Sequence, residues 1–145
     1  QSSTNKVEWQ QAQVLSANGT GNARSLARFW QVMAHGGSLG GVELLDDQLV
    51  AQMSKEHSVG MDKTLHCPTR FGLGVMLEQE WQGGSFGMGP QAFGHPGAGG
   101  ALGFCDPEAQ VGFGYVTNTM GPYVLTDPRA GELSREIYRC LREFS

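Results

Sequence analysis

Three short stretches of this chain have residue types and spacings that could support nucleophilic attack on a carbonyl. The first, Gly83–Gly87, reads G-x-S-x-G, the pattern of a nucleophile elbow in which a strand-to-helix turn exposes a serine. Here Met88-Gly89-Pro90 follows, and a helix cannot continue through that proline. No acidic residue lies between Ser85 and His95, the only later histidine, so the order Ser, Asp, His is also missing. The match is interpreted as chance in a glycine-rich segment.

The second stretch is Ser3-Thr4-Asn5-Lys6, which reads S-x-x-K, a spacing at which a lysine can deprotonate a serine. Ser16-Ala17-Asn18 likewise fits a loose [Ser/Tyr]-x-Asn pattern. Both lie within residues 1–21, which are polar, lack a sustained period and are predicted to be a leader or loop. A nucleophile of this kind sits at the start of a buried helix, and none is predicted there. Both matches are interpreted as coincidences.

His66-Cys67, the third stretch, could suggest a metal ligand pair or a thiol nucleophile. A metal site needs three or four ligands, and His35, His57 and Cys105 do not extend the pair with a ligand-like spacing. The glycine patterns that bind phosphate groups, G-x-G-x-x-G and G-x-x-x-x-G-K-[ST], do not occur. We therefore expect neither a metal nor another cofactor.

A further histidine, His95, stands in the glycine-rich stretch Phe93–Gly100. Eight of the 22 glycines fall within residues 83–100. Taken alone, the stretch fits a loop between two strands. Its interpretation depends on the elements around it.

Those elements begin with a helix predicted over residues 22–36. Asn22 can cap it, an apolar stripe at i, i+3, i+4, i+7 spacing follows, and Gly36-Gly37 ends it. A second helix is expected at 46–55, after which residues 56–70 are irregular. Apolar residues then alternate with others at 71, 73, 75 and 77, which predicts a strand over about residues 70–78.

Two more strands are predicted at 101–105 and 110–117, joined as an antiparallel hairpin by the turn at Asp106-Pro107. A last helix is predicted over 128–144, with Asp127 as its cap and an apolar stripe at Leu133, Ile137, Leu141 and Phe144. Glycines on the strands allow a helix or a ligand to approach closely. The order of elements predicts an α+β fold in which an antiparallel sheet packs against helices.

Composition narrows the class of partner. The chain has 145 residues, a formal net charge of −4 and ten scattered Lys and Arg residues, so a nucleic acid or an acidic membrane surface is not expected. No apolar run approaches the ~18 residues of a membrane span. Three cysteines without C-x-x-C spacing cannot form a complete disulfide framework, which favours a reducing compartment such as the cytoplasm or the mitochondrion.

The chain resembles the serine β-lactamase-like superfamily, which includes class C β-lactamases, family VIII carboxylesterases and penicillin-binding-protein relatives. The resemblance covers about residues 18–144 and rests on an ordered series of segments: Asn22–Trp30, Gly36-Gly37, Leu44-Leu45, Phe71–Gly74, Gly94–Gly100, Asp106-Pro107, Tyr115–Asn118 and Asp127–Arg129. It implies that residues 22–145 are the C-terminal part of a β-lactamase/transpeptidase-like fold. An upstream part would then supply the S-x-x-K nucleophile and the Tyr-x-Asn motif, which this chain lacks.

The resemblance also implies a role for His95-Pro96-Gly97, which matches the family's third motif, Lys/His-x-Gly. His95 would take the place of the lysine and hydrogen-bond the substrate or the catalytic tyrosine. The backbone N–H of Ala98 would be an oxyanion-hole donor, and Gly97 would let substrate lie against the strand. The implied reaction is acyl transfer through a serine acyl-enzyme.

Two departures from the family pattern affect the expected substrate. His95 replaces the common lysine, which gives a weaker and pH-dependent positive charge. Pro96 replaces a Thr or Ser and cannot hydrogen-bond a substrate carboxylate. We therefore expect small-molecule ester or peptide-like amide substrates rather than β-lactams. The alternative is a non-catalytic interaction or assembly module that keeps the fold.

The family fold uses sheet strands from both chain ends, so this part alone would leave a sheet edge unpaired. Pairing with the missing N-terminal part, or with a second copy in a homo-oligomer, is the expectation. The chain alone is expected to be catalytically silent.

Overall fold

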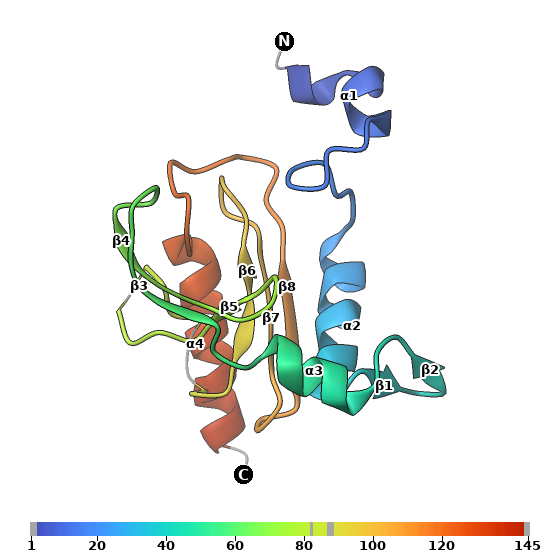
Figure 1. Ribbon diagram of the computed structural model, residues 1–145, viewed down its shortest axis with the longest axis vertical. Helices are drawn as coiled ribbons and strands as arrows, with labels where there is room; N and C mark the ends of the chain where they lie inside the picture. The colour runs from blue at the N-terminus through green and yellow to red at the C-terminus, as the bar shows by residue number, and fades with distance from the viewer. Residues whose placement is uncertain (1–2, 82, 87–88, 144–145) are drawn as a thin grey trace.

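A six-stranded antiparallel sheet with one long helix on each face forms the body of the protein (Figure 1). The computed structural model describes residues 3–81, 83–86 and 89–143. The helices are α1 (Val7–Gln11), α2 (Ala23–Ala34), α3 (Asp47–Met53) and α4 (Pro128–Glu143), preceded by a 3-10 turn at Ser3–Asn5. The strands of the large sheet are β3 (Ser58–Asp62), β4 (Cys67–Phe71), β5 (Met76–Leu77), β6 (Phe93–Pro96), β7 (Leu102–Asp106) and β8 (Val111–Tyr115).

The large sheet follows the chain order from β3 to β8, with antiparallel pairing throughout. A separate hairpin joins β1 (Ser38–Leu39) to β2 (Val42–Glu43). This arrangement of helices and antiparallel strands is the predicted α+β fold. The hairpin of β7 and β8 also agrees with the prediction, and Asp106 and Val111 are paired across it.

Helix α2 starts where local chemistry predicts it. The Asn22 side chain accepts the Ser25 backbone N–H at 2.9 Å, and the Ser25 hydroxyl accepts the Asn22 backbone N–H at 3.1 Å. These two bonds form a capping box, which satisfies donors that a helix start would otherwise leave unpaired. The buried residues of the helix are Trp30, Val32, Met33 and Ala34.

Glycines in β7 and β8 allow α2 to lie close to the sheet. A Cβ added at Gly112 would lie 2.2 Å from the Gln31 backbone nitrogen, and one at Gly114 would lie 2.5 Å from that of Ala27. No side chain fits at such distances, so the glycines fix the spacing between helix and sheet. Strand glycines were expected to allow close approach of either a helix or a ligand. On the face of the sheet covered by α2, they allow close packing of the helix.

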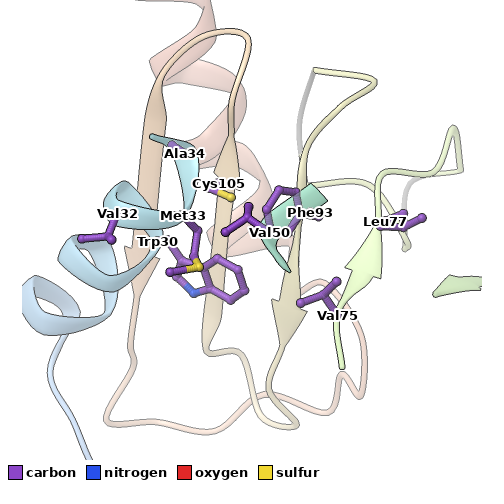
Figure 2. Packing of buried hydrophobic residues seen from close by; sticks show 9 residues of the cluster. All are labelled: Trp30, Val32, Met33, Ala34, Val50, Val75, Leu77, Phe93 and Cys105. Carbon is purple, nitrogen blue, oxygen red and sulfur yellow. The ribbon is translucent and has the colours of Figure 1, made fainter. Parts of the chain in front are cut away.

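Two clusters of buried side chains fill the two faces. Figure 2 shows the cluster under α2, where Trp30 and Met33 meet Phe93 and Cys105 of the sheet. The second cluster lies under α4 and joins Phe104 and Phe113 to Tyr138. The sheet is therefore a central layer covered on both faces, and β6 runs through its interior.

Three predictions about elements are wrong. Residues 70–78 do not form one strand: β4 ends at Phe71 and β5 begins at Met76, and these two residues pair across a tight turn at Gly72–Gly74. Gly74 has a φ of +72°, which reverses the chain where alternation alone continues a strand. Residues 56–70, predicted to be irregular, contain β3 and the first four residues of β4; the side chains of β3 are largely exposed and thus show no alternation. Residues 1–21 contain α1 rather than loop alone.

The remaining predicted ranges differ from the structure by a few residues. Helix α3 lies within the range 46–55, with the Asp46 side chain accepting the Leu49 N–H at 2.7 Å. The strands predicted at 101–105 and 110–117 run over 102–106 and 111–115. Helix α4 follows Asp127 as expected, whereas the predicted end at residue 144 lies outside the described residues.

Candidate functional site

The three residues of the His-Pro-Gly motif lie at the end of β6. His95 and Pro96 are the last paired positions of that strand, opposite Gly103 and Leu102 of β7. The His95 side chain is exposed and Pro96 is buried. Because Phe93 packs under α2 and side chains alternate along a strand, His95 projects from the same face of the sheet as α2.

The tautomer of His95 follows from its neighbour. Its Nδ1 lies 2.7 Å from the Pro96 carbonyl oxygen, which can only accept a hydrogen bond, so Nδ1 carries the hydrogen. In the neutral ring, Nε2 then carries no hydrogen and can accept a proton or a hydrogen bond. The ring also lies 6.4 Å from that of Phe71. The neutral ring of His95 therefore presents Nε2 as its hydrogen-bond acceptor.

A tight turn follows Pro96 and includes the backbone N–H of Ala98. The Gly97 N–H donates to the Ala101 carbonyl at 2.7 Å, and the Gly100 N–H donates to the Gly97 carbonyl at 3.0 Å. Between them, Ala98 is exposed, and its N–H has no hydrogen-bond partner among residues 3–81, 83–86 and 89–143. The turn depends on glycine, since Gly99 and Gly100 have φ values of +96° and +122°.

A cavity of about 530 Å³ lies beside this strand. Its walls come from the start of α2 and from β6 and β7, and they include His95, Pro96 and Gly97 together with Phe29 and Trp30. The structure thus brings three of the four predicted site residues to one cavity, and Ala98 follows directly in the turn at the end of the strand.

Trp30 lines this wall and has a buried indole nitrogen that lies against Gly103. The side chain is 7% exposed, and its Nε1 has no hydrogen-bond partner among the described residues. Leaving a buried donor without a hydrogen-bond partner costs about 1–3 kcal/mol. The sequence pattern placed Trp30 only in the apolar stripe of its helix. Its indole N–H could not be assigned from that pattern, because its surroundings come from β7.

The serine of the G-x-S-x-G pattern lies in a different environment. Ser85 Oγ donates to Glu78 Oε1 at 2.6 Å, and the Phe86 N–H donates to Glu78 Oε2 at 2.8 Å. Burial raises the pKa of the Glu78 carboxyl, against the opposing effect of these hydrogen bonds. Neither Ser85 nor Glu78 lines the cavity next to His95. The last residue of the pattern, Gly87, lies outside the described residues.

Other candidates are separate from the cavity. Within the described part of the chain, no group of three or more His, Cys, Asp or Glu side chains is arranged to hold a metal ion, and Cys67, Cys105 and Cys140 are free thiols. Lys6 of the S-x-x-K pattern is exposed at the start of α1. None of the helices described is both long and apolar enough to cross a membrane.

The fold and the glycine-rich strand beside its cavity define the class of the protein: a β-lactamase-like α+β domain. The chain belongs to the Beta-lactamase family, whose family model matches residues 2–135. It is 36% identical over 134 residues to the Esterase/beta-lactamase LipL of Mycobacterium tuberculosis. That match covers 91% of this chain and 29% of the relative.

The solved structures that are similar in fold include a carboxylesterase, a penicillin-binding protein homolog and EstA. A family VIII carboxylesterase has a TM-score of 0.88 and 36% identity, covering 94% of this chain and 36% of that one. A penicillin-binding protein homolog from Caulobacter crescentus has a TM-score of 0.87 and 34% identity, covering 92% and 36%. EstA from Arthrobacter nitroguajacolicus Rue61a has a TM-score of 0.83 and 30% identity, covering 98% and 38%. The chain thus spans about a third of the length of these relatives.

Proposed function

We propose that this chain forms one wall of the acyl-transfer site of a serine hydrolase that prefers esters over β-lactams. The observation that carries the proposal is the end of β6, directly beyond His95 and the cavity, where the N–H of the exposed residue Ala98 has no hydrogen-bond partner in the part of the chain that the structure describes. An unpaired N–H on a rigid turn is the group that stabilises a developing oxyanion. Membership of the Beta-lactamase family and the esterase names of two relatives support this chemistry.

The reaction would proceed in two steps. A serine supplied by the upstream part of the protein attacks the substrate carbonyl, and the Ala98 N–H donates to the oxygen as it becomes negative. The leaving alcohol departs with a proton, and water then attacks the acyl-enzyme, releasing the acid and restoring the serine. His95 would exchange a proton through Nε2 during these steps, because Nδ1 is held by the Pro96 carbonyl.

The wall next to His95 supports a preference for esters. Pro96 has no side-chain donor and is buried at the cavity, so it offers nothing to the carboxylate that β-lactam antibiotics carry. Phe29, Trp30 and Leu26 add apolar surface suited to an uncharged acyl or alcohol group. A nitrophenyl ester and a chromogenic cephalosporin, compared on the full-length protein, test this preference. Faster turnover of the cephalosporin than of the ester would contradict the proposed preference for esters.

We also propose that the outer edge of β8 is paired in the full-length protein. β8 is the last strand of the sheet in the described part of the chain, and an open edge with free N–H and C=O groups favours pairing. The remaining two thirds of a protein of the relatives' length would supply that strand, or a second copy would. Light scattering on the full-length protein and on this chain distinguishes the two, because only pairing between copies doubles the mass of the full-length protein.

A further inference from the structure

We propose that the ion pair of Asp127 and Arg129 positions the turn that carries the Ala98 N–H, which makes both of them positioning residues of the proposed site. Arg129 Nη2 lies 2.7 Å from Asp127 Oδ2, and Arg129 Nε lies 3.0 Å from Asp127 Oδ1. The guanidinium thus donates two parallel hydrogen bonds to the carboxylate, a bidentate geometry that fixes the orientation of the arginine side chain. Asp127 has no exposed side-chain surface, whereas the side chain of Arg129 is 42% exposed.

The free side of the guanidinium binds two separate backbone segments. Nη1 donates to the Thr119 carbonyl at 3.1 Å, and Nη2 donates to the Gly99 carbonyl at 3.4 Å. Gly99 is the residue after Ala98, and Thr119 belongs to the loop that follows β8. Arg129 therefore joins the turn after β6 to that loop, with the start of α4 as the fixed point.

Backbone hydrogen bonds also join the turn after β6 directly to the loop that follows β8. The Gly121 N–H donates to the Gly99 carbonyl at 2.7 Å, and the Gly99 N–H donates to the Tyr123 carbonyl at 2.9 Å. Gly99 is thus held on both its N–H and its C=O by residues 121–123 while Arg129 contacts the same carbonyl. The peptide unit next to Ala98 has little freedom to rotate as long as these partners stay in place.

The ion pair occupies space that a side chain at Gly100 or Gly121 would fill. A Cβ at Gly100 would lie 2.8 Å from Asp127 Oδ2 and 2.9 Å from Arg129 Nη2. A Cβ at Gly121 would lie 2.6 Å and 2.8 Å from the same two atoms. The backbone on both sides is therefore in direct contact with the pair, and a shift of the pair is transmitted to the turn.

Capping of α4 can be separated from this positioning role. The Arg129 backbone N–H donates to Asp127 Oδ1 at 2.9 Å, which is the bond of a helix cap. Asn caps a helix as well as Asp does, so Asp127→Asn keeps the cap and removes the charge of the pair. Arg129→Lys keeps the positive charge and removes the planar guanidinium that makes the bidentate hydrogen bonds. Arg139, which forms exposed ion pairs with Glu136 and Glu143 on the same helix, is a matched control position.

The test rests on the proposed function and uses the full-length protein that contains this chain. It compares Arg129→Ala, Arg129→Lys, Asp127→Asn and Arg139→Ala by ester hydrolysis, with kcat normalised to the active enzyme counted in a nitrophenolate burst. Since losing an oxyanion donor costs about 10²–10³ in kcat, displacing one through Arg129→Ala should cost about tenfold or more. KM should change less than about threefold, because ground-state binding loses no contact. Arg139→Ala should stay within about twofold of the wild type in kcat, as expected of an exposed pair.

Amide hydrogen exchange over residues 97–101 gives an independent readout. It should speed up in Arg129→Ala and Asp127→Asn, less in Arg129→Lys, and stay unchanged in Arg139→Ala. Unchanged exchange, or an unchanged kcat per active enzyme, would overturn the positioning role. If the wild type hydrolyses no ester but Arg129→Ala still speeds exchange, the proposed function fails while the hold on the turn stands.

Discussion

Trp30 Nε1 lies directly against Gly103, so that a Cβ at that glycine would be 2.1 Å from the indole nitrogen. The contact connects the middle of α2 to the strand opposite His95, because Gly103 and His95 are paired across β6 and β7. Gly103 therefore contributes, with Gly112 and Gly114, to the close packing of α2 on the sheet, and it also lines the cavity.

Gly103→Ala should destabilise the protein by about 1–3 kcal/mol, the usual cost of forcing extra volume into a packed core. The added methyl group must displace the Trp30 ring, which is 7% exposed and has little room to move. Gly19→Ala is the matched control, because a Cβ at Gly19 meets nothing within 4 Å. Thermal unfolding of both variants checks this. Equal midpoints for the two would show that the helix does not depend on this glycine.

Glu78 should make stability fall as the pH rises. Burial raises the pKa of its carboxyl above the ordinary value of 4.5. Between pH 4.5 and this raised pKa, the folded state therefore keeps a proton that the unfolded state has lost. Stability linked to such a group is fully present below pH 4.5 and is lost as the pH rises through the folded pKa.

Glu78→Gln cannot titrate and should lack this dependence. The unfolding midpoint of the wild type, relative to that of Glu78→Gln, should therefore decrease as the pH rises above 4.5 into the neutral range. Thermal unfolding of both proteins across this range measures the difference, which cancels the other titrating groups. A difference that stays constant, or that grows with pH, would contradict the account of Glu78 as a buried and destabilised carboxylate.

His95→Gln should lower kcat/KM for an ester by about a hundredfold or more, the range for loss of a general acid or base. The glutamine keeps a polar side chain but cannot exchange a proton at the position of Nε2. His57→Gln is the control, since His57 is exposed and the one hydrogen-bond partner of its ring among the described residues is the Gln52 carbonyl, at 3.3 Å. Comparable losses in the two variants would argue against a role for His95 in proton exchange.

Pro96→Thr should shift the preference of the enzyme towards β-lactams. The hydroxyl restores a donor for a substrate carboxylate, and a hydrogen bond to a charged group contributes about 1.5–3 kcal/mol, or about tenfold or more in rate. The ratio of cephalosporin to ester turnover in the variant and the wild type measures the effect. An unchanged ratio would mean that Pro96 does not set the preference.

Local patterns predicted the parts of the fold that depend on local chemistry. The cap at Asn22, the cap at Asp127 and the hairpin at Asp106-Pro107 each follow from a few adjacent residues, and the structure contains all three. The strand predicted over residues 70–78 was wrong because alternation cannot reveal a reversal at Gly72–Gly74. Strand β3 was missed because its exposed side chains carry no periodic signal.

The site was predicted in part, for a similar reason. His95, Pro96 and Gly97 stand in one short motif, and the structure places them at one cavity. Asp127 was expected as a helix cap and, together with Arg129, as one segment of a resemblance, but neither residue was predicted to contact the turn after β6. The contacts that make them relevant reach Gly99 and Thr119, 30 and 10 residues away in sequence. A single sequence gives no local signal for such contacts.

The most direct test of the central proposal is labelling of the full-length protein with a fluorophosphonate probe, together with its turnover of a nitrophenyl ester and a chromogenic cephalosporin. The account predicts one label per chain, located outside residues 1–145, with the ester hydrolysed faster than the cephalosporin and with this chain alone left unlabelled. Stoichiometric labelling of this chain at Ser85, or a full-length protein with neither label nor turnover, would contradict it; the second result would favour a non-catalytic interaction module.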